Sequence, residues 1–104
     1  MVRHIVMWKL KETALGKTKA ENMVELKKVL LDMKPKIKEI LNIEVGINIE
    51  GLYADNSDVV LIADFAGVKE LEIYQNHPDH EVVKAFVKEI KDPTAQRACV
   101  DYEM

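Results

Sequence analysis

Residues 74–80 read Tyr-Gln-Asn-His-Pro-Asp-His, and this stretch decides how the second half of the chain is divided. Proline lacks an N–H and pushes the residue before it away from helical backbone angles, so a helix entering the stretch should end near Asn76. Pro78 suits the first turn of a new helix, where a missing N–H costs little. The sequence therefore predicts a break between two helical segments, with Tyr74 before it and His80 after it.

Apolar residues on both sides of the break, and again earlier in the chain, recur at the spacing of amphipathic helices. Residues 68–75 lead into the break, and the stripe after it consists of Val83, Phe86, Val87 and Ile90. An earlier helix is expected from about Thr18, with a stripe formed by Ala20, Met23, Leu26, Leu30 and Met33. Pro35 should end or kink that helix, and a further turn is expected over residues 37–41.

Four segments alternate as strands do: residues 2–10, 43–50, 58–65 and 98–103. The first and third are apolar on both faces, so both of their faces require burial. In the second, one dry face is expected to hold Val45, Ile47 and Ile49, and Gly46 to mark a bulge or a close approach. Residues 11–17 are expected to form a polar loop and residues 51–57 a turn.

The element order predicts an α+β fold of the ferredoxin-like βαββαβ type, with residues 1–104 as a single domain. A four-stranded antiparallel sheet should carry two helices on one face, because crossover connections are right-handed. The other face, with Ile5, Met7, Val60 and Ile62, then needs a cover. A second copy of the same face is the simplest one, so we expect a homodimer whose sheets pack face to face into an α/β barrel.

The composition excludes several classes of protein. The formal net charge is −3, and the lysines at 27, 28, 34, 36 and 38 are offset by nearby acids, so no nucleic-acid partner is expected. No apolar run approaches the roughly 18 residues of a membrane span, and no signal-peptide pattern is present, so no membrane partner is expected. Cys99 is the single cysteine and fits a reducing compartment. These features predict a cytoplasmic protein.

Four stretches give the chain a family resemblance: residues 2–10, 58–65, 74–80 with its Tyr-x-x-His-Pro-x-His pattern, and 99–103. Together they resemble the stress-responsive A/B barrel domain family, called Dabb, of the dimeric α/β-barrel type. The resemblance covers essentially the whole chain. It implies the ferredoxin-like fold and the dimer that the strand faces also predict.

The resemblance also implies a site. In members of the olivetolic acid cyclase type, a tyrosine and a histidine act as an acid/base pair between sheet and helices. Tyr74 and His80 match that pair, and His4 matches a histidine of the pocket. The function expected is a homodimer that binds a small apolar or aromatic molecule without a cofactor. The alternative is a cofactor-free, polyketide-cyclase-like lyase or isomerase, and the cofactor-free monooxygenases of the superfamily are a third possibility.

The chemistry of the pair can be argued from the residue types. A histidine with an ordinary pKa near ~6.5 exchanges protons at neutral pH, so His80 is the candidate general base. Tyr74 is suited to donate a hydrogen bond to a developing enolate. The structural alternative is that Tyr74 packs in the core while His80 bonds a backbone carbonyl near the break.

Four further residues are expected to bind a ligand: His4, Val6, Trp8 and His77. His4 shares a strand face with Val6 and Trp8, and Trp8 either lines a pocket there or fills it. His77 precedes proline and is also suited to cap the second helix. His77 and His80 have the three-residue spacing of metal ligands, but no second cluster supplies a third ligand, so no metal is expected.

Overall fold

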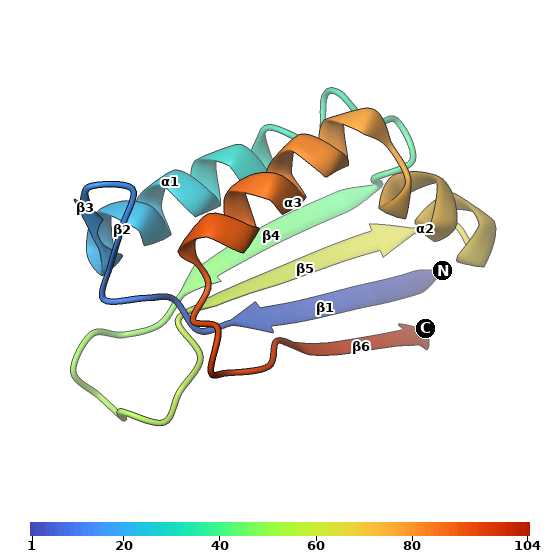
Figure 1. Cartoon of the computed structure of the whole chain (residues 1–104). Helices are drawn as coiled ribbons and strands as arrows, with labels where there is room; N and C mark the ends of the chain where they lie inside the picture. The colour runs from blue at the N-terminus through green and yellow to red at the C-terminus, as the bar shows by residue number, and fades with distance from the viewer.

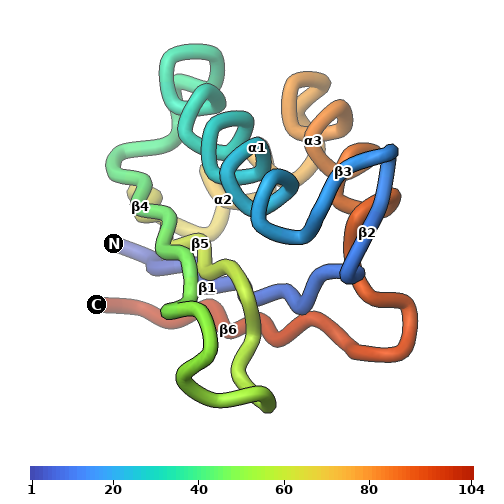
Figure 2. Tube along the Cα trace, turned by 90° about the vertical axis from the view of Figure 1, so that its left-hand side faces the viewer, coloured from blue at the N-terminus to red at the C-terminus, as the bar shows by residue number.

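Residues 1–104 are described by a computed structural model, in which the main feature is a four-stranded antiparallel sheet (Figure 1). The strands follow the spatial order β4-β5-β1-β6 and comprise Asn42–Ile47, Val59–Phe65, Val2–Trp8 and Ala98–Glu103, respectively. The helices are α1 (Lys19–Leu31), α2 (Val68–Gln75) and α3 (Pro78–Ile90). All three lie on one side of the sheet, as Figure 2 shows end-on, so the ferredoxin-like α+β fold is confirmed.

The predicted break between helices is confirmed. Helix α2 ends at Gln75 and α3 begins at Pro78, with Asn76 and His77 as the cap residues between them. The His77 side chain accepts a hydrogen bond from the backbone N–H of Asp79, which satisfies one of the free donors at the start of α3.

Residues 11–17 do not form the irregular loop that was expected. They contribute to a short hairpin of β2 (Thr13–Ala14) and β3 (Lys17–Thr18), whose turn places Leu15 and Gly16 at positive φ. The hairpin was missed because a two-residue turn with positive φ at both positions usually has Asn-Gly or Asp-Gly. Leucine rarely adopts a positive φ, so of the Leu15-Gly16 pair only the glycine indicates such a turn. Thr18 then caps α1 through a reciprocal bond with Glu21.

The two faces of the sheet differ sharply in cover. Residues 2, 4, 6 and 8 of β1 point towards the helices and are buried, together with their partners 59, 61, 63 and 65 on β5. The opposite face has no cover within this chain, and we call it the bare face. Its apolar side chains are half-buried or exposed: Ile5, Met7, Val60, Ile62, Val100 and Tyr102.

The expected strand over residues 43–50 is too long, because β4 ends at Ile47. Its last ladder partner is Val59, the first residue of β5, and beyond it the one backbone bond to the facing segment is that of the Asn48 N–H, which donates to the Asp58 carbonyl at 2.9 Å. The dry face predicted there is correct for Val45, which is buried, and wrong for Ile47 and Ile49, which are 38% and 67% exposed. Gly46 marks a close approach, since a Cβ at this position would lie 3.0 Å from Val60 Cγ1.

None of the helices is both long enough and apolar enough to cross a membrane.

Candidate functional site

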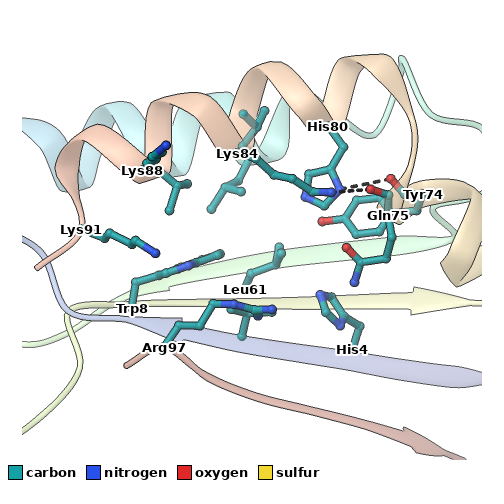
Figure 3. Close-up of a pocket in the computed structure, with 14 residues that line it drawn as sticks. His4, Trp8, Leu61, Tyr74, Gln75, His80, Lys84, Lys88, Lys91 and Arg97 are labelled. Carbon is teal, nitrogen blue, oxygen red and sulfur yellow. Dashed lines mark hydrogen bonds between the residues drawn. The ribbon is translucent and has the colours of Figure 1, made fainter. Parts of the chain in front are cut away.

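A cavity of about 320 Å³ lies between α3 and the helix-covered face of the sheet (Figure 3). Its volume is at the lower end of the range for small-molecule sites, roughly 300–1,000 Å³. The apolar walls are Val6, Trp8, Leu30, Leu61, Val83 and Val87. The cavity also holds three of the residues selected from the sequence, His4, Tyr74 and His80.

The helix break brings Tyr74 and His80 together. In a continuous helix, positions six apart lie about 120° apart around the axis. Here Tyr74 belongs to the last turn of α2 and His80 to the first turn of α3, and the two rings stack with centroids 4.1 Å apart. The Asn-His-Pro break between them thus allows the two rings to stack, which a continuous helix would not.

The His80 imidazole is held in one tautomer. Its Nδ1 lies 3.1 Å from the carbonyl oxygen of Tyr74. A carbonyl oxygen only accepts, so Nδ1 donates and Nε2 keeps its lone pair. Burial lowers the pKa of His80 from 6.5 to about 4; the bond to the carbonyl opposes this shift, and the nearby Lys84 adds to it. His80 is therefore neutral at pH 7, in the form that accepts a proton.

The Tyr74 side chain is completely buried, and its hydroxyl has no hydrogen-bond partner in the protein. Its ring contacts Phe65 and His4, with centroids 4.9 and 5.9 Å away. Burial raises the pKa of the phenol well above its ordinary value, so the hydroxyl keeps its proton. An unpartnered buried polar group costs roughly 1–3 kcal/mol, so this hydroxyl is an unsatisfied donor in the core beside the cavity.

His4 is buried, and a carboxylate orients it. Its Nδ1 bonds the carboxylate of Asp101, the residue directly opposite on β6. Because a carboxylate only accepts, Nδ1 donates this bond, and the bond fixes the orientation of the ring. The sequence could not reveal Asp101, because only the pairing of the first and last strands brings the two residues together.

Cys99 completes a group of metal-ligating types around this histidine. The ligand atoms of His4, Cys99 and Asp101 all lie within 4.8 Å of one another. Cys99 and Asp101 are exposed on the edge strand, and the carboxylate already bonds the histidine. We therefore interpret the contact between His4 and Asp101 as one that orients the imidazole, rather than as part of a metal site.

Trp8 and Val6 are also at the cavity, where Trp8 forms a wall and leaves the space open (Figure 3). The tryptophan is 7% exposed, and it is the only one in the chain. Of the two arrangements that the sequence allowed for this side chain, the lining one is observed.

His77 is the one selected residue that the structure does not bring to the cavity. Its Nδ1 accepts from the N–H of Asp79 at 3.1 Å and lies 3.6 Å from the carboxylate of the same residue. The structure thus places His77 outside this cavity, in the capping position that the sequence also allowed.

Basic residues form the outer part of the cavity, and the sequence reading missed their convergence. They are Lys84, Lys88, Lys91 and Arg97. A signal was present in the sequence: each lysine follows a buried residue of α3 (Val83, Val87 and Ile90) by one position, so the three share one flank of the helix.

Two other hollows have larger volumes, 440 and 560 Å³. The first lies between α2 and β6, and the second lies along residues 91–99. Exposed side chains form most of their walls, and neither contains a buried titratable group. The cavity at Tyr74 and His80 is therefore the better candidate site.

Solved structures of the same fold come from distant organisms. A dimeric protein of unknown function and ferredoxin-like fold from Bacteroides fragilis is 31% identical over 99% of this chain and 95% of its own, with a TM-score of 0.83. A dimeric ferredoxin-like protein of unknown function from Thermobifida fusca is 26% identical over 99% and 90%, with a TM-score of 0.78. A hydroxynitrile lyase from Passiflora edulis shares the fold at 17% identity over 97% and 90%, with a TM-score of 0.70.

No curated protein matches the sequence. The model of the stress responsive A/B barrel domain family, Dabb, matches residues 2–104. The resemblance inferred from the four sequence stretches is therefore confirmed, and the chain belongs to the Dabb family.

Proposed function

We propose that this protein acts as a homodimer that binds a small apolar or aromatic molecule in the cavity between sheet and helices. The observation that carries the proposal is the buried, unpartnered hydroxyl of Tyr74 at an open, apolar-walled cavity of about 320 Å³. A protein that needed only a packed core would gain stability by filling this space.

The dimer is supported by the bare face of the sheet. Its central residues Ile5 and Ile62 are direct partners across β1 and β5, and Val100 extends the apolar surface onto β6. Contiguous apolar surface of this kind marks an interaction site. The relatives from Bacteroides fragilis and Thermobifida fusca are both described as dimeric, and a self-complementary contact between two copies would cover the face.

The binding proposal is tested with N-phenyl-1-naphthylamine, a neutral aromatic probe whose fluorescence rises in apolar surroundings. The wild-type protein should bind it with micromolar affinity. Val83→Phe, which adds bulk to the cavity wall, should weaken binding at least tenfold. Val82→Phe is the matched control, because Val82 is 71% exposed on the same helix. Equal binding by wild type and Val83→Phe, or no binding by wild type, would contradict the proposal.

A second candidate, cofactor-free acid/base chemistry of a lyase or isomerase, is favoured by the tautomer of His80. Its Nε2 is free to take a proton, while the neighbouring phenol is free to donate a hydrogen bond to an enolate oxygen. A pKa of about 4 makes His80 a weak base in the empty cavity. The hydroxynitrile lyase of the same fold supports this candidate only by analogy of fold.

Exchange of the α-protons of 4-phenyl-2-butanone in D2O, followed by NMR, tests this chemistry. Wild type should accelerate the exchange, and Tyr74→Phe and His80→Ala should each slow it at least tenfold. His77→Asn, which retains a side chain able to cap α3, should leave the rate unchanged. His80→Ala should remain a folded dimer; loss of the dimer would instead assign His80 a structural role.

A further inference from the structure

We propose that the molecule bound in this cavity is an amphipathic anion, with its carboxylate or phosphate group held by Lys88, Lys91 and Arg97 and its apolar body against Trp8 and Leu61. The inference rests on the proposed binding function and names its ligand class. It starts from the charges at the cavity, where four residues are basic and none is acidic.

The three cations assigned to the anionic group have no ion-pair partner in the protein, like most lysines of the chain, and the two lysines that do pair are Lys19 and Lys84. Lys19 pairs with Glu12 and Asp58 at 3.2 and 3.4 Å. Lys84, at the Tyr74 end of the cavity, pairs with Glu81 at 3.0 Å and also donates to the Gln75 carbonyl. Acids outnumber bases in the chain by 18 to 15, so a cavity lined by four basic residues and no acid is not a consequence of a basic composition.

Three of the cations lie close together at the end of α3. Lys84 and Lys88 stand four residues apart on the helix and Lys91 is its C-cap, so like charges are gathered on one flank. Arg97 belongs to the segment just before β6, so positive charge reaches the cavity from two elements (Figure 3). An anion between them would relieve the repulsion, and an arginine suits the two oxygens of a carboxylate or phosphate.

The position of the cations sets the orientation of the ligand. In Figure 3, Lys91 and Arg97 lie near Trp8 at one end of the cavity, and Tyr74 and His80 lie towards the other. The anionic group would therefore remain near solvent, where its desolvation costs little. The uncharged end would reach the buried phenol and imidazole.

The test compares octanoate and octyl phosphate with octanamide, which has the same chain without the charge. Trp8, the only tryptophan and a wall of the cavity, reports binding by its fluorescence, and calorimetry measures the affinity. The variant is Lys88→Gln/Lys91→Gln/Arg97→Gln. Its matched control, Lys27→Gln/Lys36→Gln/Lys69→Gln, removes the same charge at exposed lysines outside the cavity.

We expect at least one of the two anions to bind ten times more tightly than octanamide, and to lose that advantage in the cavity variant but not in the control. A preference for octanoate over octyl phosphate, or the reverse, identifies the anionic group. Equal binding of all three compounds would overturn the anion inference and leave the binding function intact. If none of them binds, and the neutral aromatic probe does not bind either, the proposed function falls as well.

Discussion

The two faces of the sheet lack opposite kinds of contact: the helix-covered face lacks a polar one, and the bare face lacks apolar ones. On the helix-covered face, the side chains are buried, but Tyr74 keeps a hydroxyl without a partner beside an open cavity. On the bare face, the polar groups are satisfied while the apolar ones lack cover: Arg3 donates to Asp64 at 2.8 and 3.0 Å, and Met7 is 38% exposed. One polar atom of a small, otherwise apolar molecule would complete the single missing polar contact, whereas the missing apolar contacts of the bare face call for a protein surface.

The largest effect is expected from breaking the bare face. Met7→Asp places a charge in the proposed interface, next to the central Ile5–Ile62 pair, and a symmetric dimer contains that charge twice. The dissociation constant should rise about 1,000-fold, since each tenfold change requires only about 1.4 kcal/mol. Analytical ultracentrifugation measures this directly.

Val100→Asp on β6 should act in the same direction, and it alters an exposed edge position where folding is not at risk. Val82→Asp on the outer side of α3 should leave the dimer unchanged. If both bare-face variants remain dimeric at nanomolar concentration, the interface lies elsewhere.

The covered face should make stability sensitive to mild acid through His80. The pKa of His80 is lowered from 6.5 to about 4. Between these two pH values the histidine is protonated in the unfolded chain but not in the native protein. The free energy of unfolding is therefore unaffected by His80 above pH 6.5. It falls as the pH decreases towards 4, by about 3 kcal/mol for a shift of this size. Urea unfolding of His80→Gln should show a flatter pH dependence, whereas His77→Asn should retain the wild-type loss.

The Arg3–Asp64 pair on the bare face should make stability depend on pH at more acidic values than His80 does, and with a smaller loss. The Arg3 guanidinium holds the pKa of Asp64 below its ordinary value of 3.8. The stabilisation from this carboxylate is therefore present above that value and disappears as the pH falls through the lower, folded-state pKa. Asp64→Asn should remove the lowest part of the acid transition and leave the slope between pH 6.5 and 4 intact. A change of slope in that range would link Asp64 to the cavity.

The smallest change, Tyr74→Phe, should separate function from stability. Removing a buried hydroxyl that has no partner should leave the unfolding free energy unchanged or raise it by up to about 1 kcal/mol. The same variant should lose the exchange activity proposed for the cavity. A clear loss of stability would reveal that the hydroxyl has a partner in the native protein, contrary to its bonding here.

Local signals predicted most of the fold. The proline at position 78 sets the helix break, the apolar stripe from Ala20 to Met33 predicts α1, and the strands that are apolar on both faces indicate both the helix layer and the bare face. The wrong predictions concern segments whose conformation depends on their pairing with other segments. The hairpin turn uses Leu15 at a positive φ, and β4 stops at Ile47 because its partner strand begins only at Val59.

The site was predictable to the extent that it depends on residue type. His4, Tyr74 and His80 were selected from the sequence, and the structure brings them together at one cavity. Asp101 was not selected because only the register between the first and last strands places it opposite His4, and Arg97 was not selected because its place at the cavity depends on the path of the chain into β6. His77 was given a ligand-binding role because sequence proximity to His80 does not reveal which way the ring turns at a helix cap.

The bond between His4 and Asp101 has a kinetic consequence. It joins residues 97 positions apart, through a strand that pairs only with β1 and is exposed along its whole length. Contacts of such long sequence separation carry the cost of closing nearly the entire chain into a loop, and weakly buried segments are the first to detach. During folding, the core of α1, α3 and β5 would thus form before the carboxylate reaches the imidazole. Refolding followed by pulse-labelled amide exchange should find β6 protected last.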